Sequence, residues 1–197
     1  MKKIQELAIE ISENDFRKNL KLNREQRRQY IEHDKPHYEE IVIDGINDFE
    51  LIFNENLRAI VADMEIPYDR YEASVAEYVK KDQNVALFGD QLYYVMLSKM
   101  PCYNEPVEPT AEYVVEIHRF MVEQLHKIQY RPLRIEHFTD VKERMLYDRV
   151  HQQYEIEEED IKKLQKSFDS PVIQEAIAQV SAALQKDEET FGSFARK

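Results

Sequence analysis

The chain has 197 residues, a net charge of −12 and 43% hydrophobic residues, so it can bury a core and is too apolar for general disorder. With three glycines, one cysteine and no tryptophan, it has little material for the tight turns of phosphate loops and nucleophile elbows. The negative charge disfavours nucleic acid as a partner.

Apolar residues at helical spacing begin near the first residue. The pattern predicts a short amphipathic helix over residues 4–11. Residues 12–15 are expected to break this helix and cap a second, basic helix over 15–33. Pro36 interrupts that second helix, because a proline pushes the preceding residue out of the α region.

The clearest helical pattern follows Gly45, which is expected near the start of a helix. Its apolar stripe comprises Ile46, Phe49, Phe53, Leu57, Ile60 and Met64. Pro67 marks the next boundary, and a helix is expected over 68–80. Asp82 is expected to cap a further helix. The buried set of that helix would be Val85, Phe88, Leu92, Val95 and Met96.

Residues 101–109 contain three of the seven prolines and form a proline-rich crossover. This segment either separates two helical lobes or is a stiff connection within one. A single domain over 1–197 is predicted.

Four helices are predicted after the crossover. The first carries a stripe over 114–128 and ends before Pro132, and the second covers 135–154. A short helix is expected over 160–168. Ser170 and a first-turn proline then open a last helix, striped over 173–184, which is followed by a polar tail from Lys186.

These patterns predict an all-α fold, an irregular bundle of about seven to nine helices without a β-sheet. The stripes over 46–64, 114–128 and 173–184 are expected in the core, with Phe53 and Met121 buried. No internal repeat is present.

Two carboxylate-x-x-His pairs have the ligand spacing of helical di-iron sites: Glu123 with His126, and Asp148 with His151. At about 100° per residue, Glu123 points away from the stripe of its helix, and His151 also falls outside its own stripe. The pairs are therefore interpreted as solvated surface residues.

His33 and Asp34 form the doublet that is central to one class of metal-dependent phosphohydrolase. That chemistry also needs an upstream histidine and a distant aspartate as ligands, and no histidine precedes His33. The doublet is interpreted as a polar helix end. Cys102 lies in the crossover without an arguable positive neighbour to activate a thiolate, and His118 is interpreted as a boundary residue. No catalytic, cofactor-binding or metal-binding residue is predicted.

A basic stripe is the strongest functional candidate. Arg17, Lys21, Arg24 and Arg28 follow one another at three- and four-residue steps, so they project from one face of a helix. The segment 17–28 carries six positive charges against Glu25 alone. The stripe pairs with the chain's own acids, for example the run over residues 155–160, docks an acidic partner protein, or contacts a membrane or nucleic acid, which the negative charge of the rest of the surface would oppose.

The predicted function is that of a cytoplasmic interaction protein, an adaptor or a subunit of a larger assembly, without catalytic activity. Twelve tyrosines suit protein interfaces as well as core edges. The single cysteine indicates a reducing compartment. A signal peptide and a transmembrane segment are not expected, because charges interrupt every apolar run before about 18 residues. The alternative is a helical metal-dependent hydrolase or oxidoreductase that uses some of the six histidines.

Overall fold

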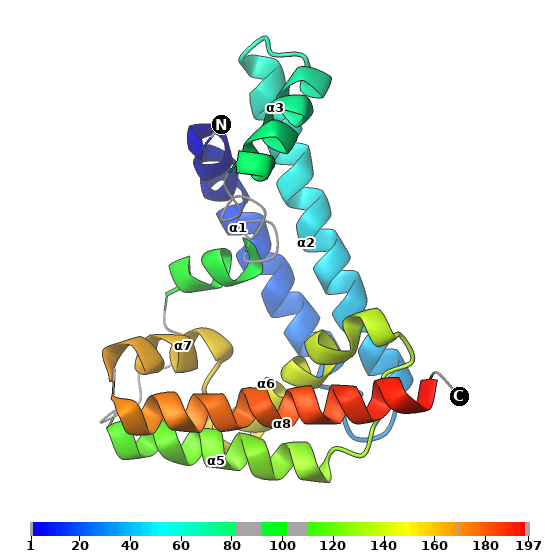
Figure 1. The fold of residues 1–197 in the computed structure, drawn as a ribbon, viewed down its shortest axis with the longest axis vertical. Helices are drawn as coiled ribbons and strands as arrows, with labels where there is room; N and C mark the ends of the chain where they lie inside the picture. Colours follow the sequence, from blue (N-terminus) through cyan, green and yellow to red (C-terminus); the bar gives the residue numbers. More distant parts are fainter. Residues whose placement is uncertain (1, 82–91, 102–109, 169, 196–197) are drawn as a thin grey trace. The chain divides into compact units, whose positions relative to one another are not determined.

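A computed structural model describes residues 2–81, 92–101, 110–168 and 170–195, and every element within them is helical, without a strand. The predicted all-α fold is confirmed. The chain divides into two compact units (Figure 1): unit 1 comprises Met1–Leu22 and Asp44–Met100, and unit 2 comprises Asn23–Ile43 and Pro101–Lys197. Among the described helices, none has the length and apolar content needed to cross a bilayer.

The first helix, α1 (Lys2–Arg27), is continuous, so the predicted break at residues 12–15 is wrong. Residues with capping side chains end a helix only where the backbone or the packing also favours an end, and α1 contains neither glycine nor proline. Ser12 is fully buried and accepts a hydrogen bond from Asn56 Nδ2 at 2.9 Å. Its hydroxyl thus joins two helical segments within unit 1 and does not cap a helix. The helix ends at Arg27, earlier than predicted, and a turn over 28–33 follows.

The second helix, α2 (Lys35–Asp63), begins well before Gly45, so its predicted start is wrong. Asp34 caps it: the carboxylate accepts a hydrogen bond from the His37 backbone N–H at 3.1 Å. Pro36 lies in the first turn, where its missing N–H is not needed. Upstream of the predicted stripe, Tyr38 and Val42 are also buried, which extends the apolar face toward this cap.

Unit 1 holds a core formed by parts of α1 and α2, by α3 (Tyr68–Lys81) and by helical residues 92–99. The helix predicted over 68–80 is confirmed. Buried members of this core include Ile4, Ala8, Phe16, Phe49, Phe53, Leu57, Ile60, Tyr71, Leu92 and Met96. Met64 was expected in the stripe but is 49% exposed, because α2 ends one residue before it. The segment 82–91, with the predicted Asp82 cap, lies outside the described residues.

Unit 2 is built on α5 (Ala111–Lys127), α6 (Phe138–Tyr154), α7 (Glu158–Ser167) and α8 (Pro171–Ala195), with a 3-10 turn η1 (Ile135–His137) before α6. The four predicted helices are confirmed. The last one continues through the polar residues after Lys186, which were expected to form a tail.

Within unit 2, α5 and α8 lie side by side and run in the same direction, and α6 packs against both (Figure 1). The stripes over 114–128 and 173–184 meet in the core. Its buried members include Ile117, Met121, Leu125, Leu146, Val150, Ile161, Val180 and Leu184. Residues 102–109 of the crossover lie outside the described part, and the single-domain organisation stays a prediction.

Candidate functional site

Unit 2 contains a buried charge cluster, defined by basic residues near the end of α1 and on α6 and by acidic residues on α6 and at the start of α7. Its members are Arg24, Arg27, Arg28, Arg144, Asp148, Glu157, Glu158 and Glu159. All of these residues except Arg28 are buried, and 18% of the Arg28 side chain is exposed. These charges therefore lose most of their contact with water, and pairing between them offsets that cost.

Asp148 is the most enclosed member of the cluster. Arg27 donates two hydrogen bonds to its carboxylate, from Nε at 2.7 Å and Nη2 at 2.9 Å. Arg28 Nε donates a third at 2.9 Å, and the Tyr38 hydroxyl donates a fourth at 2.7 Å. Burial raises the pKa of Asp148, but Arg27 and Arg28 lower it by more, so the carboxyl titrates below its ordinary range.

The acidic run at the start of α7 receives the other arginines. Arg24 binds Glu159 through both terminal nitrogens, at 2.9 and 2.7 Å. Arg28 binds Glu157 in the same bidentate manner, at 2.9 and 2.6 Å, and Arg144 Nη1 donates to Glu158 at 2.6 Å. These carboxylates also lie at the positive end of the α7 dipole, which favours negative charge.

Two local features place the start of α7 in this position. Glu155 ends α6 in the left-handed conformation, with φ 56° and ψ 27°, a backbone geometry that glycine usually provides. Glu157 and Asp160 then form a capping box, in which the Glu157 backbone N–H donates to Asp160 Oδ2 at 2.9 Å. The acidic run is thus fixed by backbone contacts as well as by arginines.

The structure divides the four residues of the predicted docking stripe between two environments. Arg24 and Arg28 pair with the run over 155–160, which is the internal pairing that the sequence left open. Arg17 Nη2 donates to Glu13 at 2.8 Å within unit 1, with 41% of the Arg17 side chain exposed, and Lys21 is exposed. Docking of a partner by Arg17, Lys21, Arg24 and Arg28 stays a prediction.

The carboxylate-x-x-His pairs do not come together. Glu123 and His126 are exposed, as expected, whereas Asp148 was expected at the surface and is fully buried. The correction follows from Arg27 and Arg28, which neutralise a carboxylate on the core side of α6. In the described part of the chain, no group of three or more histidine, cysteine or acidic residues is arranged to hold a metal.

The remaining histidine candidates and Cys102 are considered next. His33 and Asp34 are exposed in the turn before α2. The rings of His37 and Tyr30 pack edge to face, with their centroids 4.4 Å apart. His118 is buried, not at the boundary: its Nδ1 lies 2.6 Å from the Val114 carbonyl oxygen. Burial lowers the pKa of His118. Cys102 lies outside the described residues.

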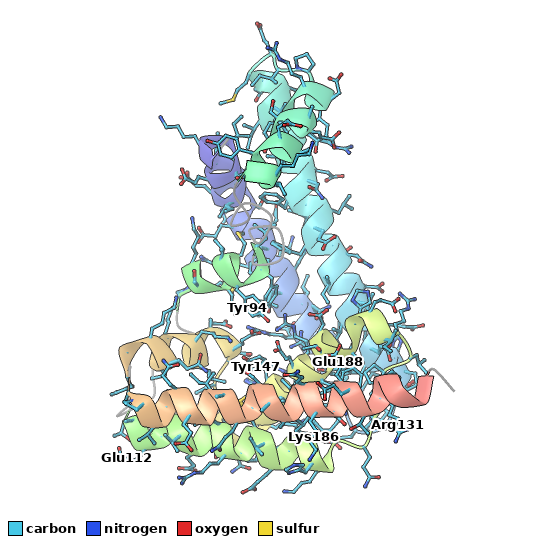
Figure 2. All side chains as sticks on the ribbon, in the orientation of Figure 1. Tyr94, Glu112, Arg131, Tyr147, Lys186 and Glu188 are labelled. Carbon is cyan, nitrogen blue, oxygen red and sulfur yellow. The ribbon has the colours of Figure 1, made fainter. Side chains whose placement is uncertain are left out.

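A pocket of about 550 Å³ lies between the end of α5, the segment 128–131, α6 and the second half of α8. Its polar lining includes His126, Tyr130, Arg131, Lys142, Lys186 and Asp187. In Figure 2, Arg131 and Lys186 are labelled toward one end of the α5–α8 pair, opposite to the end at which Glu112 is labelled. We call this cavity the basic pocket, because Arg131, Lys142 and Lys186 line it and Asp187 is the one carboxylate in its lining.

Lys142 is the fixed element of the basic pocket. Only 2% of its side chain is exposed. Its Nζ donates to the Ile128 carbonyl at 3.1 Å and lies 2.9 Å from Asp187 Oδ2. Burial lowers the pKa of Lys142 and Asp187 raises it, while the charges of Arg131 and Lys35 lower it further. Arg131 and Lys35 are therefore close enough to Lys142 to act on its charge.

The hydroxyl of Tyr130, which also lines the pocket, is already engaged in a hydrogen bond. Its hydroxyl donates to Glu39, whose carboxylate also accepts the backbone N–H groups of Leu133 at 2.8 Å and Arg134 at 2.9 Å. Burial, Glu39 and Asp34 together hold the pKa of Tyr130 far above its ordinary value. Glu39 thereby fixes the segment after α5 that carries Arg131.

The sequence did not predict the basic pocket. One signal was present: Lys142 lies four residues after Phe138 and three before Met145, on the apolar side of α6. Arg131 and Lys186 gave no signal, because neither lies in a pattern. The chain matches no protein-family model, and neither a curated protein nor a solved structure shows significant similarity to it.

Proposed function

We propose that the protein is a non-catalytic interaction protein of the cytoplasm, an adaptor or a subunit of a larger assembly. Its basic pocket would receive acidic groups of a partner protein. The observation that carries this proposal is the concentration of Arg131, Lys142 and Lys186 around one cavity of about 550 Å³ in a chain of net charge −12.

Charge segregation of this kind favours selective association. An acidic molecule repels acidic partners over most of its surface, so a local positive cavity determines where such a partner can bind and in which orientation. The volume lies within the usual range of ligand sites, about 300–1,000 Å³. The pocket therefore has room for one or two side chains of a partner.

The cations around the pocket differ in rigidity. Lys142 is held by Ile128 and Asp187 before any partner binds, so little side-chain entropy is lost when it contacts an anion. Lys186 and Arg131 are exposed and can adjust to the partner. A pair at the rim contributes about 0.2–1 kcal/mol, whereas the contact with Lys142 excludes water and contributes more.

The proposal is tested by affinity purification from the native cell, with three forms of the protein and quantitative mass spectrometry. The forms are the wild type, the pocket variant R131E/K186E and the control variant R119E/K166E. Arg119 on α5 and Lys166 on α7 are exposed in unit 2 and do not line the pocket, so the control changes the net charge by the same amount.

We expect the control to recover the same partners as the wild type and the pocket variant to lose at least one of them. Added salt should release that partner, because screening weakens contacts between exposed charges. Equal recovery by all three forms, with both variants folded, would contradict the proposed role of the pocket.

A further inference from the structure

The part of helix α1 that belongs to unit 1 has apolar residues on two sides. Its inner side packs into the core of this unit, where Phe16 is buried. On the other side, Leu7, Ile11 and Leu22 are 39%, 48% and 46% exposed. At about 100° per residue, these three side chains lie within about 60° of one another and at least about 120° from Phe16. A surface helix is usually polar on its solvent side, so this apolar stripe is a candidate contact surface.

Exposed charges are segregated along the same side of the helix. Glu10 and Asp15 lie beside the stripe in its first part, and Lys18 and Lys21 follow in its second part. Within the described part of the chain, the side chains of Glu10, Asp15 and Lys18 form no hydrogen bond or ion pair. We call the surface formed by these charged residues and the stripe the outer face of α1. Its first half is negative and its second half is positive.

The outer face of α1 complements its own copy in one orientation. When two copies of the helix run antiparallel, the acidic half of each faces the basic half of the other. Leu7 and Ile11 then lie toward Leu22 of the second copy. Lys3 and Glu6, nearer the N-terminus, carry opposite charges and leave this pattern unchanged. In a two-fold symmetric contact each pairing occurs twice. Parallel helices would instead bring like charges together, which disfavours association.

From this arrangement we infer that the outer face of α1 binds the same face of a second copy of the chain, with the two helices antiparallel. The contact is independent of the proposed function, because the basic pocket lies in unit 2. From Leu7 to Leu22 the helix is about 24 Å long. One helix face of this length buries less than the about 800 Å² per partner of a standard interface. The dimer is therefore weak, with a dissociation constant of about 10–100 μM.

The test is sedimentation equilibrium of the full chain over about 5–500 μM, a range that brackets the expected dissociation constant. The wild type should change from the mass of one chain to the mass of two. E10K/D15K makes the outer face positive along its length, and K18E/K21E makes it negative. Each variant alone should dimerise at least about tenfold more weakly, because like charges then face each other. An equimolar mixture of the two should associate at least as tightly as the wild type.

Two further variants locate the contact. E50K/E55K changes the net charge as much as E10K/D15K does, at two exposed positions of α2 in unit 1, and it should dimerise like the wild type. L7Q/I11Q removes the apolar contact without a change of charge. It should weaken the dimer at least about tenfold, because apolar burial contributes to the contact. Circular dichroism checks that every variant keeps the helical content of the wild type.

Each contrary outcome overturns a stated part of the inference. A wild type that stays monomeric at about 500 μM would show that the face does not bind a second copy. If such a monomer loses a cellular partner through L7Q/I11Q, the face binds a different protein and the assignment to a second copy is wrong. Equal dimerisation of the wild type, E10K/D15K and K18E/K21E would exclude the antiparallel arrangement. A mixture that associates no better than its two components would contradict the charge pairing.

Discussion

At the scale of single residues, Asp148 illustrates the condition under which this chain buries charge. Its carboxylate is fully buried and accepts hydrogen bonds from Arg27, Arg28 and Tyr38. The attraction between such charges approximately offsets the cost of removing them from water, so the intact pairs add little net stability. Removing one partner is different, because the other charges stay buried without compensation.

We therefore expect Asp148→Asn to lower the free energy of unfolding by about 3–5 kcal/mol, since Arg27 loses its carboxylate partner while the shape of the side chain is kept. Urea denaturation followed by circular dichroism measures this change. The exposed Glu123→Gln is the control, and its effect should stay within about 0.5 kcal/mol. A loss for Asp148→Asn no larger than that of the control would contradict the buried pairing.

The pH dependence of stability gives a second readout of the same variant. The pKa values of Asp148 and Glu157 are lowered in the folded state, because arginines outweigh the effect of burial. The stability that such carboxyls contribute is fully present above their unfolded pKa of about 4. It is lost as the pH falls through their lower pKa values in the folded state. The wild type should therefore lose stability below about pH 4 more steeply than Asp148→Asn. Parallel acid curves would contradict this assignment.

At the scale of elements, apolar spacing predicted the helices of unit 2 well and the ends of α1 and α2 poorly. The stripes of α5 and α8 are simple amphipathic patterns, and Met121 and Val180 are buried as expected. The break at residues 12–15 failed because Ser12 is satisfied by Asn56, 44 residues away in sequence. A contact of that range leaves no local trace in the sequence.

Distant contacts also limit what the sequence predicts about the candidate sites. Asp148 and Lys142 both lie on the apolar side of α6, and a charged residue there predicts a buried partner. Local spacing cannot say which partner it is: Arg27 is 121 residues from Asp148 in sequence. Only the proposed pairing between the basic stripe and the run over 155–160 could be anticipated, from charge complementarity.

Gly45 tests the continuity of α2. The residue lies in the helix interior, and no described glycine has a positive φ, so alanine fits the same backbone conformation. Gly45→Ala should raise the free energy of unfolding by about 0.5–1 kcal/mol, because glycine loses more backbone entropy in a helix. Thermal denaturation measures the change. A lower stability would show that the helix needs glycine at this position.

At the scale of the whole molecule, the charged features are distributed unevenly between the two units. Unit 2 contains the buried charge cluster and the basic pocket. The residues of the predicted docking stripe fall in both units, with Arg17 and Lys21 in unit 1 and Arg24 and Arg28 in unit 2. Stability and partner binding can therefore be examined separately by reversing the two pairs of residues in two variants.

R24E/R28E should lower the melting temperature by at least about 10 °C, because buried carboxylates then face glutamates in place of arginines. R17E/K21E should change it by less than about 4 °C, because these side chains are more exposed. Differential scanning calorimetry compares the two variants, and equal shifts would contradict the division. Partner affinity of the folded R17E/K21E variant tests the docking prediction for that half of the stripe.

The central claim is that acidic groups of a partner protein enter the basic pocket. Carbodiimide coupling of the native complex tests it most directly, because this reagent joins a lysine to a carboxylate only where the two are in contact. Mass spectrometry should find Lys186 joined to aspartate or glutamate residues of the partner. Coupling of the partner to Lys18 or Lys21 on α1, with none at Lys186, would contradict the account.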